Sequence, residues 1–153
     1  MKGIELEEKL DALCKRRVIT KREKQGITLA REAFKCSPYQ KIKIGAVIQK
    51  KKRILGIGFN QKKTHPKQQY YNQYRDEFNP IWKGYLHAEM DALRKVEGDD
   101  LKDAVLYVYR ELHDGSLGIC RPCNACMEAI KRAGIKTIVY TTHDGSICKE
   151  VVL

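Results

Sequence analysis

His87-Ala88-Glu89, followed further along the chain by Pro122-Cys123-Asn124-Ala125-Cys126, is the pattern that decides how this chain folds and what chemistry it supports. Histidine and cysteine side chains suit zinc, and catalytic zinc sites use three protein ligands and leave the fourth position to water. A carboxylate that is not needed as a ligand can carry protons. We therefore expect His87, Cys123 and Cys126 to bind Zn²⁺ beside Glu89.

Both motifs open helical patterns. Residues 127–133 continue the second motif as a helix, with Pro122 expected at its first position. The apolar residues around the first motif also have helical spacing, in a pattern that ends at Gly98: Leu86, Met90, Leu93 and Val96. Helix N-termini favour thiolates through their positive end and their free N–H groups. We therefore expect two helix starts to point at one metal ion.

A purely structural zinc site is the alternative interpretation of these residues. Such a site prefers a fourth cysteine or histidine ligand, and Cys120 lies three residues before Cys123. A structural site explains neither His87 nor Glu89 in this pattern, so a hydrolytic zinc centre is favoured.

Four short apolar stretches predict strands. Residues 44–48 and 54–60 flank the basic turn Lys50-Lys51-Lys52-Arg53 and are typical of a hairpin. Residues 104–109 follow the first motif helix, and residues 137–141 follow the second. Strands that alternate with helices favour a sheet covered by helices.

With these residues the chain resembles the cytidine deaminase superfamily, and within it the CMP/dCMP-type deaminases, whose zinc and glutamate signature it carries. The resemblance covers roughly residues 27–145 and rests on residues 44–48, 58–60, 86–89, 122–126 and 133–140. The stretches Ala133-Gly134-Ile135 and Val139-Tyr140 are more similar to deoxycytidylate deaminases than to tRNA adenosine deaminases. The latter usually have glutamate where this chain has Arg121.

The resemblance implies an α/β protein with a cytidine-deaminase-like, three-layer α/β/α fold and a mixed sheet of about five strands. It implies that Glu89 is the catalytic proton shuttle and that Asn60 and the backbone of Ala88 bind the substrate, at its sugar and at the pyrimidine edge. The implied zinc ligands are His87, Cys123 and Cys126. The implied reaction is hydrolytic deamination of the cytosine base of a dCMP- or CMP-like nucleotide, which gives uracil and ammonia. A homo-oligomer is also implied.

The length of 153 residues fits a single deaminase domain over residues 1–153. Residues 1–35 are expected to form an N-terminal helical region, and residues 61–84 an insertion before the catalytic helix. No apolar run is long enough to span a membrane. The six cysteines, at least two of them needed as thiolates, argue for a reducing cytoplasm rather than a disulfide scaffold. The remaining cysteines outside the motif are expected to be thiols: Cys14, Cys36 and Cys148.

Positive charge is concentrated in one part of the chain. Residues 36–84 contain 11 Lys/Arg and 2 Asp/Glu, whereas residues 85–153 contain 9 and 11. We expect the basic part to flank the substrate mouth, where it would attract an anionic substrate. A solvated, lysine-rich surface is the alternative.

The aromatic residues of the insertion are spaced like one face of a helix: Tyr70, Tyr71, Tyr74, Phe78 and Trp82. Such a stripe more often packs against a core or another subunit, but aromatics interleaved with Lys and Arg can also stack nucleobases. A cytosine deaminase that acts on single-stranded DNA or RNA is therefore the alternative function. A third hypothesis, a catalytically idle zinc-fold protein that binds a partner, leaves Glu89 unexplained.

Overall fold

The computed structural model describes residues 20–39, 41–75 and 85–152 of the chain. Its centre is a five-stranded mixed sheet with the strand order β2-β1-β5-β6-β7. The strands are β1 (Ile44–Lys50), β2 (Arg53–Phe59), β5 (Ala104–Arg110), β6 (Thr137–Thr141) and β7 (Ile147–Val151). Strands β5 and β6 pair in parallel, whereas β1 pairs antiparallel with both β2 and β5, and β6 pairs antiparallel with β7.

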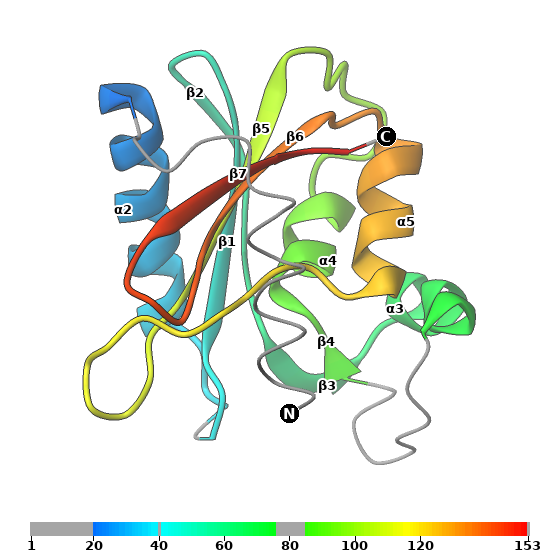
Figure 1. The fold of residues 1–153 in the computed structure, drawn as a ribbon. Coiled ribbons are helices and arrows are strands. Elements are labelled where there is room, and N and C mark those ends of the chain that lie inside the picture. The colour runs from blue at the N-terminus through cyan, green and yellow to red at the C-terminus, as the bar shows by residue number, and fades with distance from the viewer. Residues whose placement is uncertain (1–19, 40, 76–84, 153) are drawn as a thin grey trace.

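Helices cover both faces of this sheet. Helix α2 (Lys21–Lys35) packs on one face, and α4 (Ala88–Arg94) and α5 (Asn124–Ala133) pack on the other (Figure 1). Strand β1 is buried along its five central residues, as expected of a strand between two helical layers. The expected three-layer α/β/α arrangement with a mixed sheet is confirmed.

The larger of the two apolar cores lies on the α4 and α5 side of the sheet. It contains fully or almost fully buried residues of both helices and of the adjoining strands, among them Leu86, Met90, Leu93, Ile130 and Ile138. Burying one such side chain stabilises a fold by about 1.5–3 kcal/mol. The two helices that carry the sequence motifs are therefore fixed to the sheet by apolar packing.

The motif helices start and end at other residues than expected. Helix α5 begins at Asn124 with Cys123 as its N-cap, so Pro122 precedes the helix instead of opening it. Helix α4 ends at Arg94 with Lys95 as its C-cap. Gly98 has a positive φ of 86° and belongs to the turn that follows, because a left-handed residue cannot continue the helix.

The insertion is only partly helical. Strand β3 (Gln61–Thr64) pairs antiparallel with β4 (Tyr85–Leu86), and between them lie α3 (Pro66–Tyr71) and the 3₁₀ turn η1 (Asn72–Tyr74). The expected helical stripe is wrong beyond Tyr71, because Asn72 ends α3 and the backbone is extended at Arg75. Phe78 and Trp82 lie outside the described residues.

Helix α2 is the described part of the expected N-terminal helical region, since residues 1–19 lie outside the description. It begins with a capping box in which Thr20 and Glu23 bind each other's backbone N–H groups. The single domain over residues 1–153 stays a prediction. In the part of the chain that the structure describes, no helix has the length and apolar character needed to cross a bilayer.

Candidate active site

The two helix starts meet, as the motifs predict. His87 is the N-cap of α4 and Cys123 the N-cap of α5, and neither side chain caps its own helix. Instead, His87 Nδ1 lies 3.5 Å from Cys123 Sγ and 3.4 Å from Cys126 Sγ. All three donor atoms lie within 4.8 Å of one another.

This set of donor atoms fits a zinc ion. With the usual Zn–S and Zn–N bond lengths, a tetrahedral ion holds a sulfur and a nitrogen ligand roughly 3.6 Å apart, close to the two separations found here. A hydrogen bond with Cys126 and the neighbouring His87 lower the pKa of Cys123 well below its ordinary value in spite of burial. This lowered pKa favours the thiolate of Cys123, the form that binds metal.

Cys120, the fourth ligand that a purely structural site would need, is not part of this cluster. Its Sγ lies 3.1 Å from Thr141 Oγ1, and burial raises the pKa of its thiol to about 12. Among the described residues, the group of donors close enough to share a metal contains three members. Three protein ligands are typical of a catalytic zinc site, which keeps one position open.

Glu89 lies in the first turn of α4 and is only 5% exposed. Burial raises the pKa of its carboxyl, and the nearby His87 offsets part of this effect. Among the described residues, no lysine or arginine forms an ion pair with it. Burying an unpaired carboxyl costs stability, and such groups are concentrated in functional sites.

A cavity of about 260 Å³ opens beside the cluster. It is lined by five of the six residues that the sequence singled out: Asn60, His87, Ala88, Glu89 and Cys123. The sixth, Cys126, is fully buried and does not line the cavity.

Asn60 is held at the end of β2 by its own side chain. Its Oδ1 accepts hydrogen bonds from the Ile44 N–H at 2.9 Å and the Ser37 hydroxyl at 2.7 Å. Its Nδ2 donates to the Ile42 carbonyl at 2.5 Å. Because an amide nitrogen carries two hydrogens and the described residues supply one acceptor to Nδ2, its other N–H can serve a ligand in the cavity.

Asp91 ties this strand end to the catalytic helix, and sequence reasoning did not identify it. The carboxylate is fully buried and accepts hydrogen bonds from the Phe59 N–H at 3.1 Å and from Gln61 Nε2 at 3.0 Å. Arg94 Nε donates to it at 2.7 Å. Asn60 is thereby fixed relative to α4, which carries Glu89.

Sequence reasoning also missed several walls of the cavity, including Tyr39, Tyr85 and Arg121. The rings of Tyr39 and Tyr85 meet edge to face with centroids 6.1 Å apart. Arg121 binds Glu150 of β7 through two hydrogen bonds of 2.7 and 2.9 Å. Tyr85 and Arg121 each stand one residue before a motif segment, 86–89 and 122–126, but no local pattern marks either of them as a wall of the cavity.

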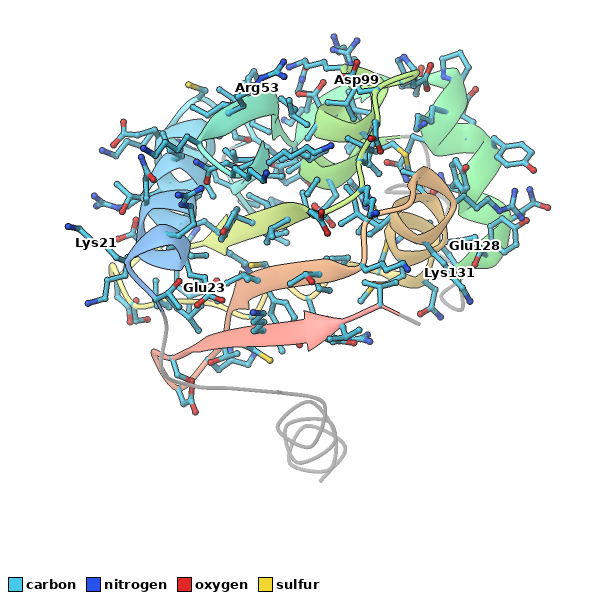
Figure 2. The ribbon with its side chains drawn as sticks, turned by 90° about the horizontal axis from the view of Figure 1, so that it is seen from above. Lys21, Glu23, Arg53, Asp99, Glu128 and Lys131 are labelled. Carbon is cyan, nitrogen blue, oxygen red and sulfur yellow. The ribbon has the colours of Figure 1, made fainter. Side chains whose placement is uncertain are left out.

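The expectation that the basic residues flank the mouth is wrong for the β1–β2 turn. This turn, Lys50 to Arg53, lies at the opposite end of both strands from the cavity residues Ile44 and Asn60 (Figure 1). Seven strand residues span roughly 20 Å. There Lys50 pairs with Asp100 at 3.5 Å, and Figure 2 shows Arg53 and Asp99 at the same edge of the molecule.

Other basic residues do lie at the cavity. Lys62 follows the lining residue Gln61, and its Nζ lies 5.4 Å from the ring centroid of Tyr39. Lys41 and Lys43 flank the lining residue Ile42 in the chain. The charge near the mouth is therefore smaller than composition suggests.

The cysteines outside the cluster differ from one another. Cys36 is an exposed free thiol. Cys148 is fully buried and disulfide-bonded, so the expectation of a thiol at this position is wrong. Cys14 lies outside the described residues, and the cytoplasmic location stays a prediction.

Known proteins resemble this chain in sequence and in fold. The family model described as "Cytidine and deoxycytidylate deaminase zinc-binding region" matches residues 20–142. A deoxycytidylate deaminase of Mycobacterium phage D29 is 30% identical over 128 residues, which cover 73% of this chain and 88% of that protein.

Two solved structures illustrate the likeness in fold. The cytidine deaminase from Burkholderia pseudomallei superposes with a TM-score of 0.60 at 20% identity, over 88% of this chain and 94% of that chain. The dCMP deaminase from cyanophage S-TIM5 in complex with dCMP and dUMP gives a TM-score of 0.55 at 21% identity, over 80% and 83%. Together with the family match, the donor cluster and the buried glutamate establish that this chain belongs to the cytidine and deoxycytidylate deaminase family.

Proposed function

We propose that this chain is a zinc-dependent hydrolase that deaminates the cytosine base of a free nucleotide, dCMP or CMP, to uracil with release of ammonia. Family membership supports the deaminase activity. The observation that carries the mechanism is Glu89, a buried carboxyl that lies in the same cavity as His87 and Cys123 and has no ion pair within the described part of the chain. A binding module would have no use for this destabilising group.

His87, Cys123 and Cys126 would hold the metal. When bound, zinc lowers the pKa of water toward neutrality and so supplies hydroxide at pH 7. The three ligand atoms are brought together by two partly buried helix starts, and neither His87 nor Cys123 forms a side-chain cap that must break first. Little reorganisation is therefore needed for binding.

Glu89 would move the protons. It takes one from the attacking water, delivers one to N3 of the ring, and helps to protonate the amine that leaves C4. A new C–O bond forms at C4 as the C–N bond breaks, and the amine departs as ammonia. A pKa raised by burial suits a group that must both accept and release protons.

Ala88 and Asn60 would orient the base and the sugar. A Cβ on Gly58 would lie only 2.2 Å from the Ala88 carbonyl oxygen, so this oxygen faces β2. The N–H of Ala88, in the first turn of α4, has no partner within the helix. It is thus the backbone group available to the pyrimidine edge, while the remaining N–H of Asn60 serves the sugar.

The size and rim of the cavity favour a single nucleotide. Its volume of about 260 Å³ lies just below the range of roughly 300–1,000 Å³ that is usual for drug-sized ligands. Lys62 at the rim offers a charge to a phosphate. The homo-oligomeric state implied by the family resemblance stays a prediction.

A polynucleotide is the second candidate substrate, because the exposed Lys41, Lys62 and Lys63 lie in the chain beside the cavity-lining residues Ile42 and Gln61. The contacts of the tyrosines that were expected to stack nucleobases argue against a polynucleotide substrate. Tyr70, Tyr71 and Tyr74 surround Arg132, with its guanidinium carbon 5.1–5.9 Å from their ring centroids. All three rings therefore already contact a cation of α5.

The test is to incubate the zinc-loaded protein separately with dCMP, CMP, deoxycytidine and a short cytosine-containing single-stranded oligonucleotide. Release of ammonia and formation of the uracil product are measured, with Glu89→Gln as the control. We expect turnover of the free nucleotides. Turnover of the oligonucleotide alone would overturn the choice of substrate, and no turnover of any of the four would contradict cytosine deamination.

A further inference from the structure

The segment formed by α3 and η1 lies against both helices that carry the metal cluster. Figures 1 and 2 both show α3 beside α5. On its other side, Lys67 of α3 pairs at 2.9 Å with Glu97, which follows α4. A segment that contacts both helices is placed to control the distance between their ligands.

Gln68 of α3 makes the decisive contact. Its side chain is fully buried, and its Oε1 accepts a hydrogen bond of 3.0 Å from the backbone N–H of His87. Its Nε2 donates to Asn72 Oδ1 at 2.8 Å, which fixes the amide plane. A buried amide without partners is costly, so these bonds account for a glutamine inside the fold.

The position of His87 explains why this bond matters. His87 is the N-cap of α4, and its imidazole is turned toward Cys123 and Cys126 instead of capping the helix. The peptide that carries the ring is therefore not held by its own side chain. The Asp91 N–H holds the His87 carbonyl at 2.9 Å, and Gln68 holds the His87 N–H.

The aromatic contacts hold the other end of the segment. Arg132 of α5 donates to the hydroxyl of Tyr70 at 3.0 Å and also to that of Tyr74. These groups are solvent-exposed, and exposed polar contacts contribute little to stability. The part-buried bond between His87 and the fully buried Gln68 side chain is therefore the contact whose loss should matter most.

We propose that Gln68 is a positioning residue of the metal site, which sets the His87 imidazole against the two cysteines by holding the His87 peptide. The inference rests on the proposed zinc site. It assigns the insertion a role as a support for the metal ligands, in place of a surface that stacks nucleobases. Without Gln68, the part-buried His87 N–H loses this partner, and the ring loses its fixed direction.

The test compares Gln68→Met with Gln69→Met, the same change at the neighbouring, exposed position of the same helix. Zinc affinity is measured by competition with a chromogenic chelator, and ligand geometry by the visible spectrum of the Co²⁺-substituted protein. Loss of a partner outside the ligand shell typically weakens metal binding about 10–100-fold. We expect this loss and an altered Co²⁺ spectrum in Gln68→Met, and wild-type behaviour in Gln69→Met.

An unchanged zinc affinity and Co²⁺ spectrum in Gln68→Met would overturn the proposal, even if the melting temperature fell. If Gln68→Met does not fold, Asn72→Ala is tested instead, because it removes the bond that fixes the Gln68 amide and leaves Gln68 in place. Wild-type zinc affinity in Asn72→Ala would also overturn the proposal. Failure of the wild-type protein itself to bind zinc would instead reject the proposed function.

Discussion

Replacing Gly58 by alanine should push the catalytic helix away from the sheet. Gly58 lies on β2 under the first turn of α4, and a Cβ there would lie 2.2 Å from Ala88 O and 2.4 Å from Ala92 N. Ordinary contact begins at 3.4 Å, so α4 would have to withdraw by about 1.2 Å. Overpacking costs about 1–3 kcal/mol. Because both close atoms are backbone, we expect a loss near 3 kcal/mol.

The displacement would act directly on the site, since Ala88 stands between His87 and Glu89. A misplacement of about 1 Å can reduce a rate about 100-fold, and we expect a fall in kcat of this order. A stability loss of about 3 kcal/mol lowers the melting temperature by roughly 6–12 °C for a protein of this size. Both are measured on the zinc-loaded protein, by thermal unfolding and by ammonia release from dCMP.

Gly56→Ala is the matched control on the same strand. Its Cβ would lie 2.8 Å from Ala92 O, which demands a shift of only about 0.6 Å at the second turn of α4. We expect a smaller loss of stability and little change in kcat. Wild-type melting and turnover in Gly58→Ala would refute the packing argument, and equal kcat losses in the two variants would refute a local effect on the site.

Three further changes test individual residues. Glu89→Gln should keep zinc and fold but lower turnover on the order of 10²–10⁴-fold, and substantial ammonia release would reject its role. In the metal-free protein, burial favours protonated Glu89, so its contribution to stability is fully present below the ordinary pKa of 4.5 and is lost as pH rises through the raised pKa. The melting temperature of metal-free Glu89→Gln should therefore change less with pH in this range than that of the wild-type protein. Cys123→Ala should lose zinc, and a chelator should then leave its melting temperature unchanged; full zinc content would contradict its role as a ligand. Lys62→Gln should raise KM for dCMP but not for deoxycytidine, whereas Lys51→Gln, at the far end of the hairpin, should alter neither; a rise for both substrates would exclude a phosphate contact.

The elements that sequence patterns predicted are those whose signals are local. The apolar strands and the two motif helices each carry their own periodicity within a few residues. Strand β7 was missed because Ile147–Val151 includes Lys149 and Glu150, which read as a polar tail. Glu150 is buried only because Arg121 and the Tyr140 hydroxyl bind its carboxylate, and both come from elsewhere in the chain.

The same distinction applies to the site. The metal cluster could be predicted because its residues come from two compact motifs, whereas Tyr39 reaches the cavity from a distant segment and Tyr85, two residues before His87, belongs to no motif. The role of Gln68 could not be predicted, since it lies in a polar stretch and its buried side chain binds the backbone N–H of His87, a residue distant in the chain. The basic turn was assigned to the wrong end of the sheet because charge counts carry no direction along a strand.

These misses have a common physical origin in how the site is stabilised. His87 and Cys123 occupy N-cap positions but do not cap, and a missing cap typically costs about 1 kcal/mol of helix stability. Glu89 adds the cost of a buried carboxyl to which the described residues offer no ion pair. Local rules are thus broken at the residues proposed to do the chemistry. The contacts that compensate, the apolar packing of α4 and α5 and the bond from Gln68, lie outside the motifs. Motifs therefore reveal the reactive groups, and only the assembled fold reveals what holds them in place.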